Sequence, residues 1–140
     1  MKNLMNWNRC KKEFIRKLEP DLERVESIKK NAFLRLKRAR STNFNSENVS
    51  LIVDDYYEVI KELLVAYLLK NGLRSKNHQC LISYFAKENP NLEGEAILIS
   101  QMSFFRNRLE YYGEKVPVEF YKQRKEDFEH LVDVLLKLVK

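Results

Sequence analysis

Two arginines flank an asparagine in the segment 105–113, FRNRLEYYG, whose surroundings are otherwise apolar. Arg106 precedes Glu110 by four residues, so on a helix the two side chains share a face and can form an ion pair. Asn107 precedes Tyr111 by the same interval. An arginine fork, an amide and a phenol near a helix end can together hold a phosphate group. The segment therefore predicts either a structural ion pair or an anion site, whose candidate catalytic residues are Arg106, Asn107 and Tyr111.

A second polar segment, GLRSKNH at 72–78, precedes a predicted helix. It combines two basic residues, a hydroxyl, a capping amide and an imidazole with the N–H groups of a helix start, which favour anions. It predicts either a ligand site or an ordinary helix cap with a packed histidine. It lacks the glycine spacing and GK[ST] of a Walker loop, and we expect no metal or cofactor. The candidate ligand-binding residues in the two segments are Arg74, Ser75, Lys76, His78, Arg108 and Tyr112.

The composition indicates a single all-α domain. The chain has 140 residues with only three glycines and three prolines, and 33% of its residues are charged. This length suits one domain with one core, and the scarcity of turn residues favours helices over a turn-rich sheet. We expect one domain over residues 1–140, built as an antiparallel bundle of four to five helices.

Turn and capping signals divide the chain into elements. Pro20 and Asp21 mark a helix start, and the Ser- and Asn-rich stretch 41–50 predicts a connection. The most apolar helix is expected at 51–69, with Gly72 just after its end. Further helices are expected at 78–87, at 93–112 and from 117 onward. The predicted core comprises Val53, Tyr56, Ile60, Leu63, Leu98, Met102, Phe105, Leu109, Phe128, Leu131 and Leu135.

The positive charge is concentrated near the N-terminus. The formal net charge is +6; residues 1–40 hold 13 Lys/Arg against 5 Asp/Glu, and residues 41–140 hold 13 against 15. Such a basic helical region can attract RNA, dock an acidic protein or meet anionic lipid. A solvated helix face is the structural alternative. The basic face is expected to carry Arg24, Lys30, Arg35, Lys37 and Arg38.

The sequence shows no sign of a membrane or secreted protein. The longest unbroken apolar run, residues 63–69, is far shorter than the roughly 20 residues that span a bilayer. The N-terminal residues lack the apolar core of a signal peptide. Cys10 and Cys80 have no CxxC or Cys/His cluster nearby, so we expect reduced, packed cysteines and a cytoplasmic location.

Three segments, in order along the chain, resemble the HEPN domain family. They are the apolar helix that ends in LLKNGLRSKNHQCLISYF, the helix end RNRLEYYG, and the closing helix with VLLKLV. The resemblance covers residues from about 51 to 139. It implies a bundle of four or five helices that is usually dimeric and often encoded beside a minimal nucleotidyltransferase. Many such domains are metal-independent endoribonucleases, including toxins of toxin–antitoxin and defence systems.

In those ribonucleases the resemblance implies an active site near the dimer interface, made by an Arg, a following polar residue and a His shortly after. Arg106 and Asn107 match the first two positions. Tyr111, Tyr112 and Gly113 stand where the His would fall. A tyrosine with its ordinary pKa of about 10 is a poor proton shuttle near neutral pH.

The expected function is therefore that of a HEPN-like homodimeric module that has kept the Arg and lost the His. Such a module would bind RNA or a nucleotide phosphate, or dock a nucleotidyltransferase partner, without cleaving RNA by the usual route. Two alternatives stay open. One is an endoribonuclease that uses Arg106 with Tyr111 or His78, and the other is a non-catalytic helical adaptor that docks through its basic helix.

Overall fold

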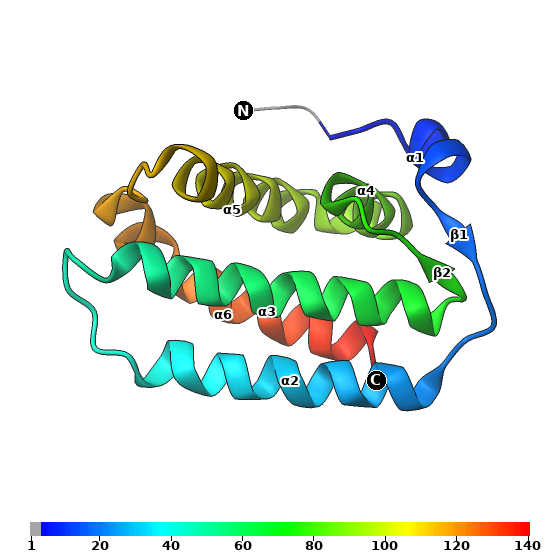
Figure 1. Cartoon of the computed structure of the whole chain (residues 1–140), viewed down its shortest axis with the longest axis horizontal. Helices are drawn as coiled ribbons and strands as arrows, with labels where there is room; N and C mark the ends of the chain where they lie inside the picture. The colour runs from blue at the N-terminus through cyan, green and yellow to red at the C-terminus, as the bar shows by residue number, and fades with distance from the viewer. Residues whose placement is uncertain (1–3) are drawn as a thin grey trace.

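The computed structural model describes residues 4–140 as a helical bundle with one short two-stranded ribbon (Figure 1). The all-α prediction is confirmed. In chain order the elements are α1 (Trp7–Glu13), β1 (Arg16–Lys17), α2 (Leu22–Ser41), α3 (Val49–Lys70), β2 (Leu73–Arg74), α4 (His78–Glu88), the 3-10 helix η1 (Pro90–Leu92), α5 (Glu93–Tyr112) and α6 (Val118–Leu138).

Helix α3 is the centre of the bundle. Helices α2, α4, α5 and α6 all pack against it, and the four long helices alternate in direction along the chain (Figure 1). Apolar residues occur around most of its circumference, and 14 of its 22 residues are buried. Such a helix must be enclosed by its neighbours to remove that surface from water. Within residues 4–140 no helix is both long enough and apolar enough to cross a membrane.

The helix ends follow the predicted capping signals. The Asp21 carboxylate accepts a hydrogen bond of 3.0 Å from a backbone N–H in the first turn of α2, and the Asn77 amide oxygen does the same at 3.3 Å for α4. Gly72 and Gly113 follow α3 and α5 with φ values of +74° and +65°. A left-handed residue at this position is the usual helix stop, and glycine adopts it without a steric cost.

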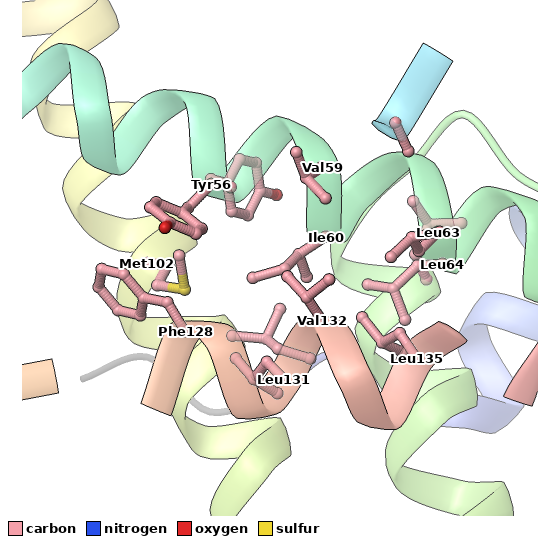
Figure 2. Close-up of a cluster of buried hydrophobic side chains, with 14 of the residues drawn as sticks. Tyr56, Val59, Ile60, Leu63, Leu64, Met102, Phe128, Leu131, Val132 and Leu135 are labelled. Carbon is pink, nitrogen blue, oxygen red and sulfur yellow. The ribbon is translucent and has the colours of Figure 1, made fainter. Parts of the chain in front are cut away.

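The core lies where α3, α5 and α6 meet, and Figure 2 shows α3 side chains facing Met102 of α5 and Phe128 of α6. Two predicted core residues, Phe105 and Leu109, are only half-buried. The buried stretch of α5 ends at Ser103, so the last turns of this helix lie at the edge of the bundle. The predicted core residues that are buried are Val53, Tyr56, Ile60, Leu63, Leu98, Met102, Phe128, Leu131 and Leu135.

The basic N-terminal region is divided rather than continuously helical. A short α1 packs Trp7 against Tyr84 of α4, with ring centroids 5.4 Å apart. The chain then forms β1, which pairs antiparallel with β2 and places Arg16 opposite Arg74. Only after this ribbon does α2 begin. The ribbon anchors the N-terminal segment to the loop between α3 and α4.

The expectation of reduced cysteines is wrong in this structure. Cys10 of α1 and Cys80 of α4 form a disulfide, with their Cα atoms 5.5 Å apart and a sequence separation of 70. Both cysteines are fully buried. The bond is invisible in the sequence because only the packing of α1 on α4 brings two such distant residues within bonding range.

Candidate functional site

Three carboxylates surround the guanidinium of Arg106 on α5. Its Nη1 lies 2.6 Å from Glu110, its Nη2 3.6 Å from Glu58 and its Nε 3.8 Å from Asp54. The predicted Arg106–Glu110 pair is confirmed, and α3 supplies two further acids. Burial, and then the charge of Glu58, raise the pKa of Asp54. We call Arg106 and these three carboxylates the arginine cluster; it links α5 to α3. The side chain of Arg106 is 18% exposed, so the cluster lies at the edge of the core.

The ring of Tyr57 connects Arg106 to His78. The Arg106 Cζ lies 6.0 Å from the ring centroid, and the Tyr57 Oη lies 3.3 Å from the His78 Nδ1. The same hydroxyl donates to Ser103 Oγ at 3.4 Å. Burial lowers the pKa of His78, and the charges of Lys61 and Arg106 lower it further. The lowered pKa favours the neutral form of the imidazole.

A hollow of about 330 Å³ opens beside this cluster, between the start of α4 and the last turns of α5. We call it the α4–α5 hollow. Asn107 and Tyr111 both line it, which confirms that they share a face of α5. The Arg106 Nη1 donates to the Asn107 Oδ1 at 3.4 Å, so the arginine cluster supports one wall. The lining residues are Gln79, Ser100, Phe104, Asn107, Arg108, Tyr111 and Tyr112.

Arg108 and Tyr112 form the outer part of this hollow. The Arg108 guanidinium lies 4.5 Å from the centroid of the Tyr112 ring, within the range of a cation–π contact. Its Nε also donates to Glu114 at 2.9 Å. This hydrogen bond raises the pKa of Arg108 and lowers that of Glu114, so both groups stay charged. The Tyr112 ring itself is 68% exposed.

The predicted loop 72–78 does not join that site as one unit. Arg74, Ser75 and Lys76 line a different hollow of about 440 Å³, between the end of α1 and the start of α4. We call it the α1–β2 hollow. His78 instead contacts Tyr57, whose ring lies against Arg106 of the arginine cluster. The candidate ligand-binding residues therefore divide among the arginine cluster and two neighbouring hollows.

No family model matches this chain, and no curated protein or solved structure matches it. The chemistry of the site must therefore be argued from its own geometry. In the part of the chain that the structure describes, no group of three or more His, Cys, Asp and Glu side chains is placed to hold a metal ion. The carboxylates on α3 and α5 face the Arg106 guanidinium instead.

Part of the predicted basic face on α2 is used within the bundle. The Arg35 Nε lies 2.7 Å from Glu62, and the Arg38 Nη2 lies 2.6 Å from Asp55. Both acids belong to α3, so these arginines fasten the two helices together. Within residues 4–140, no carboxylate lies within ion-pair distance of the remaining three residues of that face, which are Arg24, Lys30 and Lys37.

The α3 residues beside Arg106 were not among the predicted site residues. Asp54, Glu58 and Lys61 occur four and three residues apart in an otherwise apolar helix, which places them on one face. That polar stripe was a usable signal. Tyr57 and Gln79 carried no comparable signal, because a buried tyrosine and a glutamine early in a helix are common in any bundle.

Proposed function

We propose that the protein binds RNA or a nucleotide at the α4–α5 hollow. The observation that supports this best is the lining of the hollow, which combines exposed aromatic rings, two side-chain amides and one arginine. Unpaired bases bind proteins by stacking on aromatic rings and by hydrogen bonds along their edges. The hollow offers both kinds of contact within one small concave surface.

The dimensions and charges of the hollow suit a single nucleotide. Its volume of about 330 Å³ is at the lower end of the range for small-molecule sites. Phe104 and Tyr111 are 42% and 72% exposed, so a base can reach their rings. Gln79 and Asn107 offer amide donors and acceptors to a base edge, and Arg108 offers a charge-assisted contact to phosphate.

The structure suggests a different role for Arg106 from the one expected. Because three carboxylates already contact its guanidinium, a phosphate would have to compete with them. We assign Arg106 to positioning: it holds α5 on α3 and donates to the Asn107 amide oxygen. The ligand contacts in this proposal come from Asn107, Arg108 and Tyr111.

Isothermal titration calorimetry with uridine and adenosine monophosphates tests the site. Stacking contributes about 1–3 kcal/mol per base, so Tyr111→Ala should weaken binding by about fivefold or more. Asn107→Ala should also weaken nucleotide binding, because it removes a hydrogen bond to the edge of the base. Phe33→Ala and Asn91→Ala are matched controls, because both residues are exposed and lie outside the hollow. Equal losses in the controls, or no binding by the unaltered chain, would refute the proposal.

A second candidate function is metal-independent cleavage of RNA. It is favoured by the contact between His78 and Tyr57, whose ring lies against Arg106. A neutral imidazole near a guanidinium can act as general base, and His78 could in this way replace the histidine that is missing after Arg106 and Asn107. RNA degradation in the presence of a chelator, lost in both His78→Asn and Arg106→Gln, would establish it. Activity retained in His78→Asn would leave Tyr111 as the alternative group.

The resemblance to the HEPN family adds proposals about partners and setting. We propose a homodimer that works beside a nucleotidyltransferase, as toxin–antitoxin modules do, and a cytoplasmic location, where RNA and nucleotides are abundant. Co-purification with the product of the adjacent gene tests the partner. The Cys10–Cys80 disulfide bears on the location, because cytosolic thiols are normally kept reduced. Alkylation of acid-quenched cells followed by mass spectrometry would report the oxidation state in vivo.

A further inference from the structure

We infer that the β1–β2 corner is a second contact for the same RNA, one that binds the phosphate backbone. We define the basic corner as residues 11–17 and 71–78, which lie together because β1 pairs with β2 (Figure 1). The inference rests on the proposed function and specifies its ligand. The ligand is a strand of several nucleotides, whose neighbouring phosphates cross this corner, rather than a mononucleotide.

The corner holds most of the excess charge of the protein. Its two segments carry six Lys/Arg and one Glu, a balance of +5, whereas the rest of the chain carries 20 Lys/Arg against 19 Asp/Glu. The single acid, Glu13, already pairs with Arg9 at 2.7 Å. Within residues 4–140, no carboxylate lies within ion-pair distance of the six cations, which are Lys11, Lys12, Arg16, Lys17, Arg74 and Lys76.

The ribbon sets two of these cations against each other. Arg16 and Arg74 are directly opposed in the antiparallel pair, and both are exposed. Like charges opposed in this way destabilise a strand pair. An anion between or beside them removes that repulsion. Guanidinium groups suit a phosphate in particular because each can donate two parallel hydrogen bonds to it.

The backbone of the corner is held by a hydrogen bond, a close backbone approach and a disulfide. The Leu18 N–H donates to the Gly72 carbonyl at 3.0 Å, and a Cβ on Gly72 would lie 2.9 Å from the Leu18 oxygen. The Cys10–Cys80 disulfide fastens α1 to α4 on the other side. The arginines therefore project from a preorganised frame, which limits the entropy lost when an anion binds.

The corner adjoins the α4–α5 hollow across the first turn of α4. Asn77 lines the α1–β2 hollow with Arg16 and Arg74, and Gln79 lines the α4–α5 hollow. The Cα atoms of residues two positions apart are at most about 7 Å apart, so the linings of the two hollows come this close at the first turn of α4. Phe14 in the α1–β2 hollow adds a half-buried ring against which a further base can stack.

This arrangement favours a nucleic-acid strand over an acidic protein. The carboxylates of an acidic peptide would pair with the cations, but such a peptide has no base to stack on the neighbouring aromatic rings and to bind the amides. A strand uses both, because its phosphates meet the corner while a base enters the neighbouring hollow. The contacts to phosphate carry no sequence information, so the corner contributes affinity and salt dependence rather than base preference.

Fluorescence anisotropy with an oligouridylate of about 12 nucleotides tests the inference, with uridine monophosphate as the short ligand. Arg16→Gln/Arg74→Gln removes two phosphate contacts and should flatten the plot of log affinity against log salt by about 1.4. The affinity for the monophosphate should not change. Lys122→Gln/Lys125→Gln is the matched control, because both exposed lysines lie in the first two turns of α6, away from the ribbon (Figure 1).

The outcomes separate this inference from the proposed function. An unchanged salt slope in Arg16→Gln/Arg74→Gln, or an equal change in the lysine control, overturns the basic corner while monophosphate binding still supports the hollow. Oligonucleotide binding that depends on Arg16 and Arg74, without monophosphate binding, supports the corner and refutes the hollow. Failure of the oligouridylate to bind overturns the basic corner, and failure of the monophosphate to bind as well overturns the hollow. Polyglutamate that binds with the same dependence, when RNA does not, would identify a surface for acidic proteins instead.

Discussion

The phenol oxygen of Tyr57 lies 3.3 Å from the Nδ1 of His78, although the two residues are 21 positions apart in the sequence. The contact joins the central helix α3 to the first residue of α4. Through the Tyr57 ring it also brings His78 close to Arg106. The contact therefore places a half-buried imidazole among charged groups of both signs.

We expect His78 to make the fold sensitive to mild acid. Burial lowers its pKa in the folded protein relative to the unfolded value of about 6.5, so the unfolded chain binds a proton more readily. The contribution of His78 is complete above about pH 6.5 and falls as the pH drops from there toward the folded pKa. Urea unfolding at a series of pH values, with His78→Gln as comparison, measures it.

The same group can be observed directly by NMR. The titration midpoint of the His78 ring protons should lie below the ordinary value, and Lys61→Gln should raise it by removing a nearby positive charge. Lys87→Gln is the control, since Lys87 is not one of the groups that shift the pKa of His78. A midpoint that Lys61→Gln leaves unchanged would show that the charge of Lys61 does not contribute to the shift.

Removing Arg106 should destabilise the fold more than removing Arg108. Arg106→Gln leaves three carboxylates without their common partner, which should cost about 1–3 kcal/mol of unfolding free energy. Arg108→Gln breaks an exposed pair and should change the free energy of unfolding much less. Denaturant unfolding measures both.

A second substitution tests the cause of that loss. Asp54→Asn removes an acid whose ion-pair partner in residues 4–140 is Arg106, so the double variant Arg106→Gln/Asp54→Asn should regain part of the lost stability. If the two losses simply add, the arginine does not act through its contact with Asp54.

Breaking the disulfide should lower the stability of the whole fold. Cys10→Ser/Cys80→Ser removes a cross-link that closes a loop of 70 residues, for which chain entropy gives about 4 kcal/mol. Thermal unfolding followed by circular dichroism measures the change. Reduction of the unaltered protein is the matched comparison, and the doubly substituted variant should not respond to reductant.

Shortening a side chain at the centre of the core provides a reference value for the stability losses predicted above. Leu63 on α3 is fully buried, and Leu63→Ala should cost about 2–5 kcal/mol. Leu51→Ala on the same helix removes the same atoms from a side chain that is 65% exposed, so its effect should be much smaller. Comparable losses would contradict the placement of α3 at the centre.

A homodimer through α5 would cover two rings that the proposed nucleotide site also uses, so this dimer and base stacking in the α4–α5 hollow are alternatives. Ile97, Phe104 and Tyr111 are spaced by seven residues, so they share one face, and all three are exposed. A two-fold contact would pair this face with its own copy. Phe104→Glu should then convert the dimer to a monomer in analytical ultracentrifugation. A strict monomer of the unaltered chain at micromolar concentration would refute the dimer.

The sequence by itself determined the helices from α2 to α6 and where they end, but not the β1–β2 ribbon. Local signals such as Asp21, Asn77, Gly72 and Gly113 act within a few residues, and the apolar stripe of α3 repeats with the period of a helix. These effects need no distant partner, so they can be recognised without coordinates. The Arg106–Glu110 pair belongs to the same class because one helical turn separates the two residues.

Only the tertiary structure decided which of the polar residues act together. The Cys10–Cys80 bond, the opposition of Arg16 and Arg74, and the contact of Tyr57 with His78 join segments that are remote in the chain. Their proximity depends on how α1 and α4 pack on α3, which many side chains set jointly and no short motif encodes. The same packing paired arginines of α2 with acids of α3, and within residues 4–140 it left the six cations of the basic corner outside ion-pair distance of any carboxylate. A charge pattern in the sequence does not state which cations meet carboxylates.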